Sequence, residues 1–229
     1  MLNGADRMLV VGAESTISPV GVGGFASMKA LSTELNPNKA SRPFDKNRDG
    51  FVMGEGAGSI VLEDYESAKE RGAKIYGEIV GYGESGDANH ITSPIIDGPL
   101  IAMEEALKMS NNIKIDYINA HGTSTQANDK NESLAIKEVF KAYEVIPPVS
   151  SIKGQIGHCL GAAGAIEAVV SLMSIQNNII PPTINYETQD EDCTLDYVTT
   201  GSRKMTLNVI MSNSFGFGGT NGVLIFKKV

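Results

Sequence analysis

The sequence predicts an α/β protein built around a layered sheet. Short apolar segments rich in β-branched residues alternate with longer segments whose apolar residues recur every three or four positions, and this alternation is typical of α/β folds. The chain has 229 residues, enough to bury a sizeable core. No linker-like composition and no repeat of solenoid length divides it, so we expect one structural unit over residues 1–229.

Seven segments have the length and composition of strands. Each is bounded by glycine, proline or polar residues, which interrupt regular structure. In chain order these segments are residues 8–11, 59–62, 75–82, 117–119, 149–152, 207–211 and 222–226.

Three segments between these strands have helical spacing. They cover residues 100–109, 133–143 and 164–175, and the last is apolar almost all round, as expected of a buried helix. Prolines 181 and 182 follow it and begin an extended stretch. Residues 36–48 and 84–99 are predicted to be polar loops.

Composition excludes several classes of protein. Hydrophobic residues make up 41% and charged residues 20%, which excludes a disordered or fibrous chain. The net charge of −8 disfavours a nucleic-acid or anionic-membrane surface. No apolar run approaches 18 residues, and residues 1–7 do not resemble a targeting signal. The only cysteines, Cys159 and Cys193, favour a reducing compartment.

The first candidate site is the segment 119–125, Asn-Ala-His-Gly-Thr-Ser-Thr. It places the imidazole of His121 just past a strand, at the carboxyl end where α/β proteins hold ligands. Three hydroxyl residues follow the histidine. The segment leaves two interpretations open, a ligand-binding histidine and a structural one.

The second candidate site is the glycine-punctuated segment 150–164, which leads into a helix of small residues. Lys153 and His158 lie five positions apart in it. Small residues allow a backbone or a narrow ligand to approach closely. A lysine here is ordinarily a solvated surface charge. The alternative is a buried ion pair with a candidate carboxylate, Glu132, that orients the imidazole ring.

The third candidate site is the segment 213–221, Asn-Ser-Phe-Gly-Phe-Gly-Gly-Thr-Asn. Its glycines permit tight turns and leave backbone N–H groups free to face a negative charge. The segment lacks the spacing of a dinucleotide loop and is followed by a strand, so a nucleotide site is disfavoured.

Two histidines and a loop of free N–H groups suit one chemical task, the stabilisation of an enolate or a thioester oxyanion. They suit metal binding poorly, because no third ligand lies at a suitable spacing. A serine hydrolase is disfavoured as well, because the sequence has no nucleophile-elbow pentapeptide.

These motifs closely resemble those of the β-ketoacyl acyl-carrier-protein synthases, the condensing enzymes of fatty-acid synthesis, and most of all the elongating synthase II type. The resemblance implies a thiolase-like fold, in which two similar halves stack as α-β-α-β-α layers and this chain supplies mainly the C-terminal repeat. Matching segments run through nearly the whole chain in the family's order and include residues 21–25, 30–33, 41–45, 48–58 and 71–76 besides the three candidate sites.

The resemblance also implies roles for single residues. His121 and His158 match the paired histidines that hold the malonyl thioester oxygen, and Lys153, with Glu132 as its carboxylate partner, orients the site. Phe215 matches the gating phenylalanine whose backbone N–H joins the oxyanion hole. The residues implied to bind the substrate are Thr92, Thr123, Thr125 and Gly216.

The family's nucleophilic cysteine belongs to its first half, so the resemblance places that cysteine before this chain and leaves Cys159 and Cys193 in structural positions. We therefore expect the C-terminal part of a synthase that is inactive in condensation by itself. Two alternatives stay open. One is a non-catalytic partner subunit like a chain-length factor, and the other is a decarboxylase of malonyl thioesters.

The implied partner is acyl carrier protein, and the full-length enzyme is expected to be a homodimer with no nucleic-acid or membrane partner. No cofactor is expected besides the phosphopantetheine arm that carries the substrates. The bacterial cytoplasm is the expected compartment, with a plastid-type organelle as the alternative. Docking of an acidic carrier protein needs a basic patch, for which the candidates are Arg48, Lys69, Arg71 and Lys74.

Overall fold

The centre of the molecule is a five-stranded sheet. A computed structural model describes residues 5–87 and 95–229, and its largest sheet has the strand order β3-β9-β8-β4-β5. β4 runs parallel to β5 and β8, whereas β9 runs antiparallel to β3 and β8. The carboxyl ends of β3, β4, β5 and β8 therefore meet at one edge. The bounds are β3 Glu78–Gly86, β4 Tyr117–Asn119, β5 Val149–Ser150, β8 Val209–Gly216 and β9 Thr220–Lys227.

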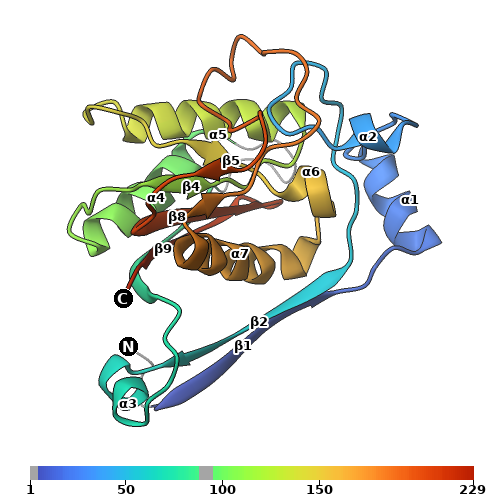
Figure 1. The fold of residues 1–229 in the computed structure, drawn as a ribbon. Helices are drawn as coiled ribbons and strands as arrows, with labels where there is room; N and C mark the ends of the chain where they lie inside the picture. Colours follow the sequence, from blue (N-terminus) through green and yellow to red (C-terminus); the bar gives the residue numbers. More distant parts are fainter. Residues whose placement is uncertain (1–4, 88–94) are drawn as a thin grey trace.

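Helices cover both faces of this sheet (Figure 1). α4 (Asp97–Met109) and α5 (Gln126–Val139) lie on one face, where Met103 and Ile136 join a core with Ile118 of β4. α7 (Ala163–Asn177) lies on the opposite face, where its Ala168 and Ile175 pack in a second core with residues of β4, β8 and β9. The sheet is thus buried on both sides, as expected for strands that are apolar throughout.

A two-stranded antiparallel ribbon forms the next layer. β1 (Arg7–Glu14) pairs with β2 (Gly56–Glu63), and α7 lies between this ribbon and the large sheet (Figure 1). A Cβ at Gly58 would lie 2.7 Å from the backbone carbon of Ala165, so only glycine lets the ribbon approach α7 this closely. The layers α4/α5, sheet, α7 and ribbon follow the α-β-α-β order of the predicted architecture.

The outer side of the ribbon and the first helix is apolar and exposed. Leu9 and Val11 of β1 are exposed, and so is Val20 of α1 (Pro19–Ser27), a helix without any buried residue. Exposed apolar side chains in such number are typical of surfaces that pack against other polypeptide.

The predicted strands all exist; β4 has the predicted ends, and the ends of the others are shifted. The segment predicted as 149–152 is a strand only at its first two residues, because α6 (Lys153–Ile156) begins directly afterwards. α1 was not predicted, since its three glycines disfavour a helix; Ser18 caps it by accepting a hydrogen bond from the backbone N–H of Gly21. Short elements that the prediction also missed are α2 (Pro37–Ala40), α3 (Tyr65–Glu70), η1 (Leu160–Ala162), β6 (Ile179–Ile180) and β7 (Arg203–Lys204).

The second predicted helix, 133–143, is α5 and begins seven residues earlier than expected, at Gln126. Its first two turns are polar and carry no apolar periodicity. The hydroxyl of Thr125 caps it by accepting a hydrogen bond from the backbone N–H of Asn128. No helix of the described residues is long and apolar enough to cross a membrane.

Candidate functional site

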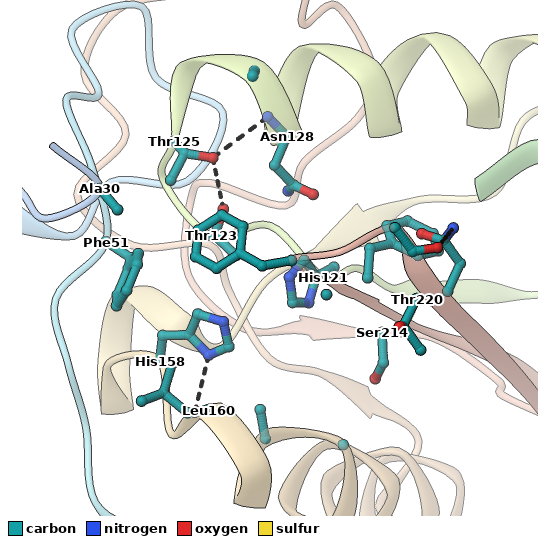
Figure 2. Close-up of a pocket in the computed structure, with 18 of the residues that line it drawn as sticks. Ala30, Phe51, His121, Thr123, Thr125, Asn128, His158, Leu160, Ser214 and Thr220 are labelled. Carbon is teal, nitrogen blue, oxygen red and sulfur yellow. Dashed lines mark hydrogen bonds between the residues drawn. The ribbon is translucent and has the colours of Figure 1, made fainter. Parts of the chain in front are cut away.

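A cavity of about 740 Å³ opens at the carboxyl edge of the large sheet. His121, which follows β4, and His158, which follows α6, both line it, and their ring centroids are 5.3 Å apart (Figure 2). Thr123, Thr125 and Gly216 also contribute to its wall. The three segments singled out in the sequence thus meet in one place because they follow strands that end at the same edge.

Glu132 of α5 fixes the turn that carries His121. Its carboxylate accepts hydrogen bonds from the backbone N–H groups of His121 at 2.9 Å and Gly122 at 2.8 Å, and from the side-chain amide of Asn213 at 3.1 Å. Burial nevertheless raises the pKa of Glu132 to about 7. The expectation that Glu132 pairs with Lys153 was wrong, because its oxygens are occupied by these donors.

The carboxylate that pairs with Lys153 belongs to Glu167 of α7. Both side chains are only 1% exposed. The Lys153 ammonium also donates to the carbonyl of His121 at 2.6 Å and lies 3.4 Å from its Nδ1. An ammonium has no lone pair, so Nδ1 must be the acceptor and the hydrogen of the neutral His121 ring must lie on Nε2.

His158 has the same tautomer for a different reason. Its Nδ1 accepts a hydrogen bond from the backbone N–H of Leu160 at 3.2 Å (Figure 2), which leaves the hydrogen on Nε2. Burial, and then the nearby charge of Lys153, lower the pKa of both histidines, that of His158 to about 3. Two neutral rings therefore offer Nε2–H donors at the cavity.

The hydroxyls of Thr123 and Thr125 form a polar wall on another side of the cavity. Their Oγ1 atoms are 2.9 Å apart and hydrogen-bonded (Figure 2). Asp129 of α5 holds the turn between them by accepting hydrogen bonds from the backbone N–H groups of Thr123 at 3.0 Å and Ser124 at 3.1 Å. These hydrogen bonds hold the turn so that it presents two hydroxyls to the cavity.

The two phenylalanines of the final glycine loop differ in environment. Phe215 of β8 is 7% exposed and packs in the main core, with its ring 5.9 Å from that of His121. Phe217, in the hairpin turn between β8 and β9, is 46% exposed and lines the cavity. Phe215 lines the cavity as well, so the two rings differ in packing and not in access to the cavity. The exposed Phe217 ring has more room to move, and the gating role expected for Phe215 stays a prediction.

Both cysteines are buried and neither lines the cavity. Burial raises the pKa of the Cys159 and Cys193 thiols, the opposite of what a nucleophilic cysteine needs. Thr92 lies outside the described residues. Among the residues that are described, no cluster of three or more His, Cys, Asp or Glu side chains could hold a metal ion.

The expected basic patch is not supported by its supposed members. Arg48 is 2% exposed and so cannot meet a partner protein. Arg71 is paired with Glu63 of β2 at 2.6 Å. Lys69 and Lys74 remain at the surface, where each ammonium lies over a tyrosine ring of its own segment.

Sequence reasoning missed Glu167, Asp129 and Phe217. A signal for Glu167 was present, since it is the only charged residue of α7, an otherwise apolar helix with small residues. Asp129 and Phe217 gave no such signal, because an acidic residue in a first helical turn and an aromatic residue in a glycine loop are both ordinary.

Comparisons with known proteins match both the sequence and the fold. Residues 1–68 match the family described as "Beta-ketoacyl synthase, N-terminal domain", and residues 76–187 match "Beta-ketoacyl synthase, C-terminal domain". The chain is 51% identical to 3-oxoacyl-[acyl-carrier-protein] synthase 2 of Coxiella burnetii, over 99% of this chain and 56% of that protein. It is 49% identical to a putative mitochondrial 3-oxoacyl-[acyl-carrier-protein] synthase of Schizosaccharomyces pombe, again over 99% and 56%.

A solved structure has nearly the same fold. It is the AntDE:AntF complex, described as a type II PKS acyl-carrier protein in complex with its ketosynthase bound to the hexaketide, and it matches with a TM-score of 0.94 at 39% identity. The match covers 98% of this chain and 57% of the solved chain. The chain thus spans little more than half the length of each of these three proteins.

Proposed function

Because this chain belongs to the β-ketoacyl synthase family, we propose that it is the C-terminal part of a 3-oxoacyl-[acyl-carrier-protein] synthase of type II, an acyltransferase that elongates fatty acids. The observation that carries the proposal is the pair of neutral histidines, His121 and His158, whose Nε2–H groups face one cavity. We propose that residues 1–229 act as one structural unit within the longer enzyme.

The acyl group is first transferred from its carrier to a cysteine, and the carrier's thiol leaves. The next chemical step is decarboxylation of a malonyl thioester. The bond between the α-carbon and the carboxylate breaks, carbon dioxide leaves, and the electron pair stays behind as an enolate. Two preorganised N–H donors aimed at the thioester oxygen stabilise the charge that appears there. Lys153 supports this role because its ammonium holds His121 in the tautomer that carries the hydrogen on Nε2.

The last step joins the enolate carbon to the acyl group. The enolate attacks the carbonyl of an acyl thioester on a cysteine, the new carbon–carbon bond forms, and the cysteine leaves as a thiolate. The environments of Cys159 and Cys193 suit neither for this step. We propose that the nucleophilic cysteine lies in a part of the enzyme outside these 229 residues.

Acyl carrier protein is the proposed partner. The amide-rich phosphopantetheine arm would lie against the hydroxyls of Thr123 and Thr125, and Lys29, which lines the same cavity, is placed to meet its phosphate. The arm belongs to the carrier protein, so we propose no cofactor for the chain itself. The exposed apolar side of β1 and α1 supports packing against the rest of the enzyme and a second copy, and we propose a homodimer in the cytoplasm.

The proposal is tested with the full-length protein that contains this chain. Purified enzyme is supplied with malonyl-carrier protein and an acyl-carrier protein, and the 3-oxoacyl product is detected by mass spectrometry. Wild type should condense, and His121→Ala or His158→Ala should lower kcat by about 100-fold or more, the loss typical of a missing oxyanion donor. The exposed variant Lys141→Ala serves as control and should leave kcat unchanged.

Absence of any 3-oxoacyl product from the full-length wild type would overturn the proposal. A partner subunit like a chain-length factor would give product only after a separate synthase is added, and nothing requires such a subunit to keep both histidines. The decarboxylase alternative is tested with the 229-residue chain, as carbon dioxide release from malonyl-carrier protein that His121→Ala abolishes.

A further inference from the structure

Arg48 has no assigned role, yet it is among the largest fully buried side chains of the molecule, at 2% exposed. We infer that Arg48 is a positioning residue, whose guanidinium holds the turn of Thr123 and Thr125 in the conformation that binds the thioester-bearing arm. This inference rests on the proposed function, which supplies the arm. It concerns a residue that touches no substrate itself and is absent from the cavity wall.

The guanidinium binds the backbone at the beginning of α5. Its Nε donates to the carbonyl of Thr125 and its Nη2 to the carbonyl of Gln126, each at 3.0 Å. Its Nη1 donates to the carbonyl of Asp45 at 2.9 Å and to the carboxylate of Asp190. Every nitrogen of the planar group is thus used, and two of the acceptors belong to the N-cap of α5 and to its first residue.

A second set of contacts holds the same turn from its other side. The side-chain amide of Gln126 donates back to the carbonyl of Arg48. Asp129, whose Oδ2 lies 3.7 Å from Nε of Arg48, accepts from the backbone N–H groups of Thr123 and Ser124. Ser124 has a φ of +70°, a left-handed conformation that few non-glycine residues adopt without such support.

The charge of Arg48 suits this place as well as its shape does. Asp129 is fully buried and Asp190 is partly buried, with 15% of its side chain exposed, and a buried carboxylate without a cation is costly. Burial opposes the charge of Arg48, but Asp129 and then Asp190 outweigh it and raise its pKa above the ordinary value. Lysine could supply the charge but not the planar fork that reaches several acceptors at once.

Arg48 acts on the cavity wall through Thr125, because the carbonyl that it binds and the hydroxyl that lines the cavity belong to the same residue. Thr125 uses its carbonyl to bind Arg48 and its hydroxyl to bind Thr123 and to cap α5, so a shift of that carbonyl moves the hydroxyl wall. Misplacement of a binding group by about 1 Å can cost about 100-fold in rate. Arg48 therefore affects binding of the arm through Thr125.

The test compares Arg48→Lys with wild type in the full-length protein. Arg48→Lys keeps the positive charge and loses the planar guanidinium with its several N–H donors. We expect the KM for malonyl-carrier protein to rise about tenfold, while kcat changes by less than about twofold, because the histidines are held by other contacts. Thr125→Val should also raise KM. The KM of the double variant should exceed the higher of the two single-variant KM values by no more than about twofold, since both substitutions act through one contact.

Asp190→Asn is the matched control. It removes the carboxylate partner of Arg48 but leaves the bonds to Thr125 and Gln126, so stability should fall while KM stays within about twofold of wild type. An equal rise of KM in Asp190→Asn and Arg48→Lys would show a general loss of stability and overturn the inference. An unchanged KM in Arg48→Lys would overturn it as well.

Two further measurements separate this inference from the proposed function. Hydrogen exchange of the backbone amides of residues 123 and 124 needs no substrate, and Arg48→Lys should speed it about tenfold. If the wild-type enzyme does not condense, the proposed function fails. If amide exchange at residues 123 and 124 is unchanged in Arg48→Lys, the positioning role fails, whatever the outcome of the condensation assay. If Arg48→Lys does not fold, Gln126→Met takes its place, at an exposed position. It should raise both the exchange rate of these amides and the KM about threefold. No change in either quantity would overturn the inference.

Discussion

Glu167 of α7 and Lys153 of α6 form an ion pair that is almost completely removed from solvent. The same ammonium binds the carbonyl and approaches Nδ1 of His121, so the pair joins the helix behind the sheet to the turn that follows β4. A buried pair adds little net stability compared with apolar residues, but removal of one partner leaves an uncompensated charge. The pair therefore couples the stability of the fold to the tautomer of His121.

Glu167→Gln should lower the free energy of unfolding by about 3 kcal/mol, because Lys153 then stays buried without its counter-charge. Urea unfolding followed by circular dichroism measures this. The double variant Lys153→Met with Glu167→Met should lose less than the single one. Lys141→Ala breaks the exposed pair with Glu138 and should cost no more than about 0.5 kcal/mol. A loss of that small size in Glu167→Gln would contradict the burial of the pair.

His158 should make stability fall as the pH falls below about 6.5. Its pKa is lowered to about 3 in the folded protein by burial and by Lys153. Between these values the unfolded chain binds a proton that the folded protein does not, so acid favours unfolding. Between pH 7.5 and 5, wild type should lose about 2 kcal/mol more than His158→Asn, measured by urea unfolding at each pH.

Glu132, whose pKa is raised to about 7, acts in the opposite direction, since it stabilises the folded protein at low pH. It is present in both proteins and cancels in the difference. A His158 ring whose NMR signals titrate near pH 6.5 would refute this prediction.

Phe215→Ala should mainly lower stability, whereas Phe217→Ala should mainly change the kinetic constants. Loss of the buried Phe215 ring should cost about 3 kcal/mol of unfolding free energy, as for other core phenylalanines. Phe217→Ala should cost less than about 1 kcal/mol, because its ring is half exposed, while changing kcat or KM of the full-length enzyme. Urea unfolding and steady-state kinetics on both variants decide between the two rings. Equal stability losses would contradict the difference in packing between the two rings.

Gly58→Ala should destabilise the 229-residue chain by about 1–3 kcal/mol. The new Cβ would lie 2.7–2.9 Å from backbone atoms of Ala165 and Ile166, so the ribbon of β1 and β2 would have to move away from α7. Gly23→Ala in α1 is the control, because nothing lies within 4 Å of its added Cβ. It should stabilise the chain by up to about 1 kcal/mol through helix propensity. Thermal unfolding of the two variants should give shifts of opposite sign.

Much of the fold was predictable because the signals are local. α7 was found within two residues of its ends, since its apolar run is long and bounded by glycine and proline. α1 was missed because its glycines disfavour a helix, and the first half of α5 because a polar turn held by the Thr125 cap has no apolar periodicity. Local patterns also identified the segments that carry His121 and His158, but not the distance between the two rings in space.

The sequence by itself determined the order of strands and helices, the family resemblance and the residue types of the site, because periodicity, turn residues and motifs are properties of neighbouring positions. Only the tertiary structure decided that Lys153 pairs with Glu167 instead of Glu132, that Phe217 is the exposed one of the two phenylalanines lining the cavity, and that Arg48 is buried. The physical reason is that a side chain's partner depends on which elements cross in space. The parallel ends of β4 and β5 and the packing of α7 on the sheet set those crossings.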